Sequence, residues 1–480
     1  MIRPSEKPHR VIVIGGGISG LAAAYFIRNG LRETGVPFEL TLIEKEDRVG
    51  GKFFAREKNG FLVEGGPNGF LDSKPWTLDL AHELGLDESL LPGDEAAARR
   101  FIYSRGRLHE LKASPMGFFA SNLLSVPGRI RIIGELFAPV TQKGRDTSLS
   151  EFAVRRLGRE VLERMLDPMV SGIFAGDPER MSLRACFPRI AELEETYGGL
   201  IKALFKIAAE KKRAKKRGED VISSGPSGPG GVLTSFKGGV CVLSDKLASA
   251  LGDCLHTGDE VITVNGSNGG WKIRTKRRDF EADTVVLATP AYAAAGILSE
   301  LSSRSSDILG RIPYSPMTIV GLGYDVKDLA RPPHGFGYLI PSVENRRILG
   351  ALWTSSIFPG YRAPEGKVLI RAMAGGARDH STPFLDESAL LKIVRSEIAE
   401  TMGLTAEPEF VAIHRWKKAI PMYTVGHLER LNLVESSLPE GIFLAGNAYR
   451  GVGINDCVRE SKGVADRVVR KMLEGPRSTG

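Results

Sequence analysis

A glycine-rich turn between an apolar strand pattern and a helical pattern constrains the fold of this chain more than any other feature. The turn is Gly15-Gly16-Gly17-Ile18-Ser19-Gly20, with glycine at its first, third and sixth positions. It follows the apolar run Val11–Ile14 and precedes a helical pattern. In such a turn Gly15 permits the sharp change of direction, Gly17 lets the backbone approach a pyrophosphate, and Gly20 lets the helix pack closely on the strand.

The segment after this turn completes a pattern typical of dinucleotide binding. A second strand pattern, residues 38–43, ends at Glu44. A helix N-terminus at the turn would offer N–H groups and a positive dipole end to phosphates. An acidic residue at the end of the second strand would accept hydrogen bonds from a ribose hydroxyl. The alternative is a turn of purely structural use. Because strand, turn, helix, second strand and acid follow in order, we expect a dinucleotide site that includes residues 15–20 and Glu44.

The residues directly after Glu44 favour one dinucleotide over another. They include Lys45, Arg48, Gly51 and Lys52. A basic residue and paired glycines just past the ribose-binding acid resemble the extended fingerprint of FAD-binding oxidoreductases of the amine-oxidase type. Plain NAD-binding domains do not require this extension. The sequence therefore favours FAD, with Lys45, Arg48, Gly51 and Lys52 among its ligands.

Length and composition exclude several classes of protein. A chain of 480 residues is long for one core, so two or three domains are expected. No uncharged apolar window reaches the roughly 18 residues needed to span a bilayer. The cysteines lie far apart, and the histidines form no H-E-x-x-H pattern. We therefore expect reduced thiols in a cytoplasmic protein and no metal site.

The chain is basic, with a formal net charge of +8. Such a charge suits anionic partners, namely acidic substrates, phospholipid headgroups or nucleic acid. The most basic segment, residues 206–217, runs into a Ser/Gly/Pro-rich stretch without aromatic platforms beside it. This pattern is typical of a solvated helix face and a flexible loop. We therefore expect no nucleic acid as a partner.

Residues 114–140 have a different composition from the rest of the chain. Their apolar residues recur at helical spacing with few charges between them, among which are Arg129 and Arg131. The pattern fits a helix pair that lies in a membrane interface. It fits equally a helical cap folded over an active-site cavity. Both interpretations stay open at this point.

Two further glycine-rich segments follow apolar strand patterns. The first of these segments is Gly66-Pro67-Asn68-Gly69. It would either bring backbone amides up to the edge of a flavin or form an ordinary turn. Near the C-terminus, the apolar run Ile442–Ala445 leads into a junction that contains Gly446, Gly451, Val452, Gly453 and Ile454. This junction would place amides and a helix dipole against an anionic flavin or a pyrophosphate. A third apolar run, residues 284–290, looks like the strand that returns to the nucleotide-binding sheet in flavoproteins with two dinucleotide folds.

With these motifs in place, the chain resembles the protoporphyrinogen oxidase family, FAD enzymes near the end of haem biosynthesis within the flavoprotein amine-oxidase superfamily. The resemblance runs nearly end to end. The segments that carry it are Gly15–Gly20 with Glu44, Glu64–Asn68, Ala98–Phe101, Ser171–Pro178, Gly335–Pro341, Ala374–Arg378 and Gly446–Cys457. The first of these is generic to the superfamily, and the later ones are specific to the family.

The family implies roles for residues that local patterns leave undecided. Arg100 matches an arginine proposed to hold a porphyrinogen propionate, although its local sequence alone favours a solvated arginine. Leu339 and Leu352 match aliphatic residues that sandwich the macrocycle. Met373 stands where plant members carry phenylalanine, and a methionine can still press its polarisable side chain on the tetrapyrrole. Two more residues, Val261 and Trp416, fall at positions that resemble FAD-contacting ones.

The expected fold is α/β, with a discontinuous Rossmann-like FAD-binding domain, a β-rich substrate domain and a helical domain that in several family members sits on the membrane. The expected segments are residues 1–75, 216–295 and 411–480 for the FAD-binding domain, 76–112 and 296–410 for the substrate domain, and 113–215 for the helical domain. The expected location is the cytoplasm, with peripheral contact at the inner face of the cell membrane.

The resemblance implies oxidation of protoporphyrinogen IX to protoporphyrin IX by removal of six electrons through FAD, with oxygen as the acceptor. We found no nucleophile–base pair in the sequence, as expected where a flavin carries the chemistry. The alternative substrate is coproporphyrinogen III, which has four propionates instead of two; the apolar Leu339, Leu352 and Met373 favour the less acidic one. A flavin-binding scaffold is the non-enzyme alternative. The next enzyme of the haem pathway is a candidate partner, and the sequence leaves the oligomeric state undetermined.

Overall fold

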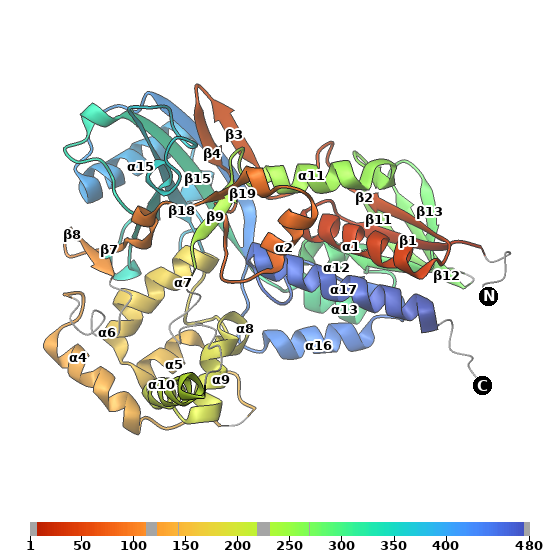
Figure 1. Ribbon diagram of the computed structural model, residues 1–480, viewed down its shortest axis with the longest axis horizontal. Helices are drawn as coiled ribbons and strands as arrows, with labels where there is room; N and C mark the ends of the chain where they lie inside the picture. The colour runs from red at the N-terminus through yellow and green to blue at the C-terminus, as the bar shows by residue number, and fades with distance from the viewer. Residues whose placement is uncertain (1–6, 112–121, 143, 218–230, 268, 475–480) are drawn as a thin grey trace.

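The computed structural model describes residues 7–111, 122–142, 144–217, 231–267 and 269–474. Two sheets organise the molecule, and a layer of helices lies beside them (Figure 1). One sheet is parallel and contains both the first described strand, β1, and the last, β20. The other is larger and is assembled mostly from the second half of the sequence.

The parallel sheet has five strands in the order β10-β2-β1-β14-β20. The bounds of these strands are β1 His9–Ile14, β2 Phe38–Ile43, β10 Leu255–His256, β14 Thr284–Leu287 and β20 Ile442–Leu444. Three separated stretches of sequence therefore build one sheet, and the nucleotide-binding unit is discontinuous. The central β1 pairs in parallel with β2 on one side and β14 on the other.

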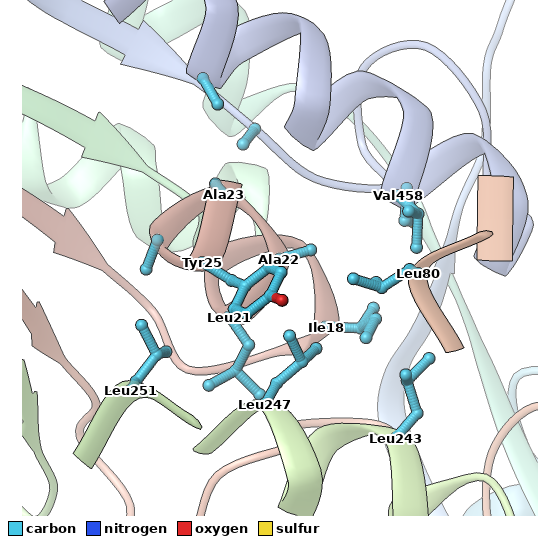
Figure 2. Close-up of a cluster of buried hydrophobic side chains, with 14 of the residues drawn as sticks. Ile18, Leu21, Ala22, Ala23, Tyr25, Leu80, Leu243, Leu247, Leu251 and Val458 are labelled. Carbon is cyan, nitrogen blue, oxygen red and sulfur yellow. The ribbon is translucent and has the colours of Figure 1, made fainter. Parts of the chain in front are cut away.

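Helices cover one face of this sheet and a second small sheet covers the other. Helices α1 (Ile18–Thr34), α11 (Cys241–Leu251) and α17 (Ile454–Glu474) share one buried cluster, part of which is shown in Figure 2. Val11 and Val13 of β1 point into this cluster, whereas Ile12 and Ile14 point into the cluster on the opposite face. Burial on both faces explains why β1 reads as a continuous apolar run rather than an alternating one.

The opposite face packs on a small antiparallel sheet with the order β11-β12-β13 and on three helices. These elements are β11 Val261–Ser267, β12 Gly270–Thr275, β13 Asp279–Ala282, α12 Ala291–Ile297, α13 Ser303–Gly310 and α16 His427–Ser437. Strands β11 and β12 pair as an antiparallel hairpin.

The large sheet has seven strands in the order β19-β15-β18-β17-β16-β7-β8. Their bounds are β7 Arg100–Ser104, β8 Arg107–Leu111, β15 Tyr314–Asp325, β16 Gly337–Leu339, β17 Ile348–Trp353, β18 Lys367–Gly375 and β19 Phe410–Pro421. Helix α15 (Glu387–Met402) covers one face through Leu390, Val394 and Ile398. Strand β19 pairs with β15 as far as Pro421, so the chain leaves this sheet later than the expected boundary at residue 410.

A layer of helices from the middle of the sequence packs beside the large sheet (Figure 1). It consists of α4 Val126–Ile133, η3 Gly134–Phe137, α5 Leu149–Arg156, α6 Arg159–Val161, the π-helical turn η4 Leu162–Leu166, α7 Asp167–Phe174, α8 Leu183–Cys186, α9 Pro188–Tyr197 and α10 Leu200–Lys216. The part of the apolar segment at residues 114–121 lies outside the described residues. No helix in the described ranges is both long and apolar enough to cross a membrane.

The remaining elements join these units. They are the hairpin β3 Ala55–Lys58 with β4 Phe61–Glu64, the small sheet of β5 Phe70–Leu71, β6 Leu90–Pro92 and β9 Leu233–Phe236, the helices α2 Trp76–Glu83 and α14 Thr354–Ile357, and the short 3₁₀ turns η1 Asp87–Ser89, η2 Glu95–Ala98, η5 Gly252–Cys254, η6 Val326–Asp328, η7 Ser342–Glu344 and η8 Thr382–Phe384. The β3–β4 hairpin packs on the large sheet, since Phe61 and Val63 lie in a cluster with Ile319 and Phe410 of that sheet.

Candidate active site

The turn between β1 and α1 needs glycine at two positions for reasons internal to the protein. A Cβ atom at Gly20 would lie 1.8 Å from the carbonyl oxygen of Gly15, and one at Gly15 would lie 2.9 Å from that of Ala288. Gly17 differs, because an added Cβ would meet no atom within 4 Å. The packing of the protein itself therefore does not require glycine at residue 17, whereas close approach of a pyrophosphate does.

Glu44 ties the end of β2 to this turn. One carboxylate oxygen accepts a hydrogen bond from the Gly16 nitrogen at 2.6 Å, and the other accepts one from the Glu46 nitrogen at 2.9 Å. The Glu44 carbonyl accepts a further bond from the nitrogen of Asp259 at 3.1 Å. This bond brings the start of β11, and with it Val261, to the same edge of the parallel sheet. By contrast, Lys45 is exposed and pairs with Glu46 at 3.2 Å.

The loop after β2 is packed against the glycine turn. The nitrogen of Gly50 donates to the Gly16 carbonyl at 2.8 Å, and a Cβ at Gly51 would lie 3.3 Å from the Cα of Gly17. The Arg48 guanidinium donates to the carbonyls of Val49 and Gly51 at 3.1 and 2.9 Å. The described hydrogen bonds of Arg48 thus shape the loop itself.

Lys52 has an amine that is strongly affected by its buried environment. Burial lowers the pKa of its amine to about 8. Its Nζ lies 5.6 Å from the ring centroid of Tyr314, and it has no acidic partner in the described part of the chain. A desolvated amine without a carboxylate beside it is suited to an anionic ligand.

The turn after β4 joins this loop to the large sheet. Arg371 of β18 donates from Nε to the Glu64 carbonyl at 2.8 Å and from its terminal nitrogen to the Gly66 carbonyl. Trp416 of β19 donates from its indole nitrogen to the Gly65 carbonyl at 2.7 Å. A Cβ at Gly66 would lie 1.9 Å from the carbonyl oxygen of Lys52. Two strands of the large sheet, β18 and β19, and the loop that carries Lys52 thus meet at one turn.

Gly69, at the end of the same turn, has a structural explanation of its own. Its φ is +156°, and an added Cβ would lie 2.4 Å from the carbonyl oxygen of Thr234 in β9. The pairing of β5 with β9 therefore accounts for this glycine. Pro67 and Asn68 lie between Gly66 and Gly69, and the Asn68 side chain is buried.

The second glycine-rich junction lies at the same edge of the parallel sheet as the first. Strand β20 pairs with β14, and β14 pairs with β1, all in parallel. Gly446 and Gly451 have φ values of +134° and +132°, in the region that favours glycine. Ile454 begins α17 in the same core cluster as α1, while Val452 packs on the helical layer. Gly453 is exposed at the start of α17.

Three buried polar groups around these turns have no hydrogen-bond partner among the described residues. They are the Asn68 amide, the Thr289 hydroxyl and the Tyr449 hydroxyl. They belong respectively to the turn after β4, the end of β14 and the second junction. Buried polar groups normally find partners, so a polar ligand that reaches all three segments fits the site. These residues, with the open side of Gly17 and the unpaired Lys52, fit a phosphate-bearing dinucleotide.

One face of the large sheet carries all four residues expected to contact the substrate; we call it the site face. Cross-strand pairing sets Leu339, Gly350 and Met373 in one row, and Arg100, Gly337 and Leu352 in the next. Corresponding residues of the two rows are two positions apart along each strand, so their side chains share a face. Arg371 belongs to the second row, opposite Leu352.

The four residues lie in two neighbouring groups on this face. Leu339 and Met373 share an apolar cluster with Trp416. Leu352 lies in a separate cluster with Phe336 and Phe358. The Arg100 guanidinium carbon lies 5.1 Å from the ring centroid of Phe336, which places it beside the second group.

Arg100 and its neighbour Arg99 have different environments. Arg99 donates to both carboxylate oxygens of Glu110, at 3.1 and 2.9 Å. Arg100 has no ion-pair partner among the described residues, and desolvation lowers the pKa of its guanidinium. Of this basic pair, Arg100 is therefore the one available to an anionic ligand.

Helix α7 of the helical layer ends against the site face. A Cβ at Gly172 would lie 2.7 Å from a methyl of Leu339, so the helix and the leucine are in direct contact. Ala175 follows with a left-handed φ of +48°, and its carbonyl accepts a hydrogen bond from Ala377 at 2.8 Å. Arg378 pairs with Asp177 at 3.0 Å. Two family-specific segments, residues 171–178 and 374–378, are thus joined in space.

Some residues of the site could not be identified from local patterns. Arg371 lies in an apolar strand, and only its strand register shows that it shares a row with Arg100 and reaches the turn after β4. Ala175 has an ordinary side chain in an unusual backbone conformation. Tyr449 could have been identified from the sequence as a candidate site residue, since it is a polar aromatic residue inside a glycine-rich junction. No cluster of possible metal ligands occurs within the described ranges.

Comparison with known proteins shows similarity over almost the whole chain. The family described as flavin containing amine oxidoreductase matches residues 18–469. Coproporphyrinogen III oxidase of Bacillus subtilis is 31% identical, covering 95% of this chain and 97% of the relative. Protoporphyrinogen oxidase 1 from chloroplasts of Arabidopsis thaliana is 32% identical, covering 93% of this chain and 85% of the relative.

Solved structures share the fold. A crystal structure from Exiguobacterium sp. 255-15 superposes with a TM-score of 0.81 at 25% identity, covering 97% of this chain and all of that one. Cyclohexylamine oxidase from Brevibacterium oxydans superposes with a TM-score of 0.70 at 16% identity, covering 98% of this chain and 100% of its own. The second similarity extends to the fold alone.

Proposed function

This chain belongs to the family of flavin-containing amine oxidoreductases, and we propose that it oxidises protoporphyrinogen IX to protoporphyrin IX in haem biosynthesis. The family confirms the predictions of an oxidoreductase and of FAD as its cofactor. Curated relatives that match nearly end to end are named protoporphyrinogen oxidase or coproporphyrinogen III oxidase. The observation that carries the choice of substrate is the site face, where Arg100 stands beside a surface that is otherwise mainly apolar.

Most of the residues that would hold FAD lie at one edge of the parallel sheet, and the others lie on the turn after β4 and on β19. Gly15, Gly16, Gly17, Ile18, Ser19 and Gly20 would receive the pyrophosphate at the N-terminus of α1. Glu44 would accept from the ribose, with Val261 and Lys45 beside it. Lys52 would neutralise phosphate charge, on a loop shaped by Arg48 and Gly51. The flavin end would meet the turn Gly66–Gly69, Trp416, and the junction formed by Gly446, Gly451, Val452, Gly453 and Ile454.

Bound FAD would supply the hydride acceptor for three two-electron steps, and the chain's own residues would bind and orient the substrate. Arg100 holds a propionate through charge-assisted hydrogen bonds. Leu339, Leu352 and Met373 contact the macrocycle and exclude water from it. Each step would remove one hydride and one proton, so six electrons and six hydrogens would leave the porphyrinogen, with oxygen as the proposed final acceptor.

The charge of the site face favours the substrate with two propionates. Arg371 also lies in the row of Arg100, but its described hydrogen bonds go to the carbonyls of Glu64 and Gly66. Arg100 is thus the guanidinium of this row left for a carboxylate. Coproporphyrinogen III has four propionates, and burying the additional carboxylates without partners would be costly.

The test compares the two porphyrinogens directly. Protoporphyrinogen IX and coproporphyrinogen III are supplied in air to the FAD-loaded protein, and porphyrin fluorescence is followed with time. Faster turnover of protoporphyrinogen supports the proposal. Faster turnover of coproporphyrinogen would move the chain to that activity with the same fold and cofactor. If neither exceeds the autoxidation rate, the protein is a flavin-binding scaffold.

We also propose that the helical layer touches the inner face of the cell membrane. Val126, Ile130 and Ile133 recur along one face of α4 and are 66%, 63% and 55% exposed, and Phe137 of the following turn is 87% exposed. Phe205 of α10 is exposed as well, and α10 contacts the turn that carries Phe137. Exposed apolar side chains gathered on adjoining helices are typical of an interfacial surface.

The membrane proposal is tested by co-sedimentation with vesicles of anionic phospholipid. Phe137→Ser should reduce binding at physiological salt. The matched control is Phe384→Ser, since Phe384 is 51% exposed on η8, outside the helical layer. Equal binding by wild type and Phe137→Ser would contradict the proposal and leave the next enzyme of the haem pathway as the candidate partner for this surface.

A further inference from the structure

Two side chains from outside the second glycine-rich junction bind alternate residues of its backbone. The Tyr423 hydroxyl donates to the Asn447 carbonyl at 2.6 Å and accepts from the Gly451 nitrogen at 2.8 Å. The Nε2 of His427 lies 2.9 Å from the carbonyl oxygen of Tyr449. Residues 447, 449 and 451 are therefore each held by one of these two rings.

The two rings support each other. Their centroids are 4.2 Å apart and their planes are 17° apart, so they stack. Both side chains are buried. Burial lowers the pKa of His427 to about 4 and raises that of Tyr423 well above its ordinary value. The imidazole is therefore neutral and donates from Nε2 to the Tyr449 carbonyl, and the phenol keeps its proton for the Asn447 carbonyl.

The segment that carries these rings is itself attached to the helical layer. The nitrogen of Ser182 donates to the Tyr423 carbonyl at 2.8 Å. The Asp146 carboxylate accepts from the Gly426 nitrogen and from the Ser182 hydroxyl, each at 2.8 Å. The helical layer thus helps to set the position of the rings, together with α16, which begins at His427 and packs on the parallel sheet.

The junction depends on such external bonds because its own sequence specifies little. Gly446 and Gly451 both have positive φ, and glycine populates many backbone conformations in an unconstrained loop. Within residues 446–451 the described backbone bond is a long one of 3.4 Å between the Tyr449 nitrogen and the Gly446 carbonyl. The bonds from Tyr423 and His427 therefore select one conformation among many.

We propose that Tyr423 and His427 are positioning residues that hold residues 446–451 in the conformation that binds the flavin end of FAD. This inference rests on the proposed role of the second junction in FAD binding and goes beyond it, because neither residue belongs to a glycine-rich turn. The two residues act through the backbone of the junction. Their substitution should therefore change the affinity for FAD while the sheet and its core stay intact.

The test removes one hydroxyl group. Tyr423→Phe keeps the ring and its stacking but loses both hydrogen bonds. The matched control is Tyr338→Phe, because Tyr338 is equally buried. Its hydroxyl is hydrogen-bonded to Thr401 at 2.6 Å, on the face of the large sheet opposite the site face. His427→Phe is a second variant, which keeps an aromatic ring in the stack and loses the donor to Tyr449.

Two measurements are made on each full-length variant. Amide hydrogen exchange of residues 446–453 is followed in the protein stripped of FAD, and the dissociation constant for FAD is obtained from flavin fluorescence. Two lost hydrogen bonds predict exchange roughly 10-fold faster and FAD binding roughly 10-fold weaker in Tyr423→Phe. Tyr338→Phe should match the wild type in both, although it loses a comparable contact.

The outcomes separate this inference from the proposed function. Wild-type exchange and affinity in both Tyr423→Phe and His427→Phe would overturn the inference. Equal changes in Tyr423→Phe and Tyr338→Phe would also overturn it, since the effect would then reflect general loss of stability. Porphyrinogen turnover is scored separately, so a wild-type protein that binds FAD but oxidises neither porphyrinogen contradicts the proposed function alone.

Discussion

The Glu44 carboxylate lies 2.6 Å from the backbone nitrogen of Gly16, and this contact joins the end of β2 to the glycine turn after β1. The second carboxylate oxygen accepts from the Glu46 nitrogen. Each oxygen retains a lone pair, so the same carboxylate can still accept from a ribose hydroxyl. Glu44 therefore shapes the turn, and in the proposed FAD site it would also bind the ribose.

Glu44→Gln should weaken FAD binding roughly 10- to 100-fold, because a charge-assisted acceptor is replaced by an amide that cannot accept at both positions. The measurement is titration of the FAD-free protein with FAD. Glu46→Gln is the matched control, since Glu46 is exposed and pairs only with Lys45 among the described contacts of its side chain. An unchanged dissociation constant in Glu44→Gln would contradict the assigned role.

Arg100→Met should raise KM for protoporphyrinogen IX about 10-fold while kcat changes less, because the lost bond to a propionate serves binding. Steady-state porphyrin fluorescence measures both constants. Arg99→Met is the matched control, because Arg99 is already paired with Glu110. Equal effects of the two substitutions would show that general surface charge, rather than Arg100, attracts the substrate.

FAD affinity should fall as pH rises above about 8, the pKa to which burial lowers the Lys52 amine. Below that pH the Lys52 amine of the free protein already carries the positive charge that is proposed to bind phosphate. Above it, a proton must be taken up on binding, so affinity declines. Cys457 also faces Lys52 but stays neutral in this range, since burial raises its pKa to about 11.

The measurement is the FAD dissociation constant between pH 6.5 and 9.5, a range chosen around that pKa. Lys52→Met should bind FAD roughly 10-fold more weakly at pH 7 and lose the pH dependence. Lys58→Met, at an exposed position of β3, should retain it. The same pH profile in Lys52→Met and wild type would assign the titration to another group.

Glu194→Gln should destabilise the helical layer by roughly 3–5 kcal/mol, because it leaves the buried Arg156 without part of its charge compensation. Glu194 accepts from Arg156 Nε at 2.7 Å and from Arg155 at 2.7 Å. Unfolding in urea measures the loss. Glu195→Gln is the control, since Glu195 is about half exposed in its ion pair with Arg184, and it should change stability by less than about 1 kcal/mol.

Glu194 also predicts the acid sensitivity of this layer. Burial opposes ionisation of Glu194, but the bonds from Arg155, Thr141 and Arg156 outweigh it and lower its pKa to about 2. The stabilisation is complete above the unfolded value near 4.5 and is lost as pH falls from there towards 2. The free energy of unfolding of the Glu194→Gln variant should therefore change less between pH 5 and 3 than that of the wild type. This range is chosen to span the transition.

The nucleotide-binding half could be predicted from the sequence because its determinants are local. A strand, a turn with glycines at set spacings, a helix and an acidic strand end follow one another within residues 11–44. Backbone sterics and hydrophobic periodicity act between neighbours in the chain, so the pattern predicts the geometry. The second junction at residues 446–454 was recognisable for the same reason. Oxidoreductase activity and the cofactor followed from these motifs together with the family resemblance.

Only the tertiary structure decided how distant segments meet. Strand register, which is set by pairing over the whole large sheet, brings Arg100 and Leu352 into one row and adds Arg371 to it. Tyr423 reaches the second junction through contacts with the helical layer, and no local pattern marks it. Such contacts depend on free-energy differences between packed arrangements of remote residues. Local conformational preferences can be predicted from a single sequence. The pairing of residues that are far apart in the sequence is known only from the folded structure.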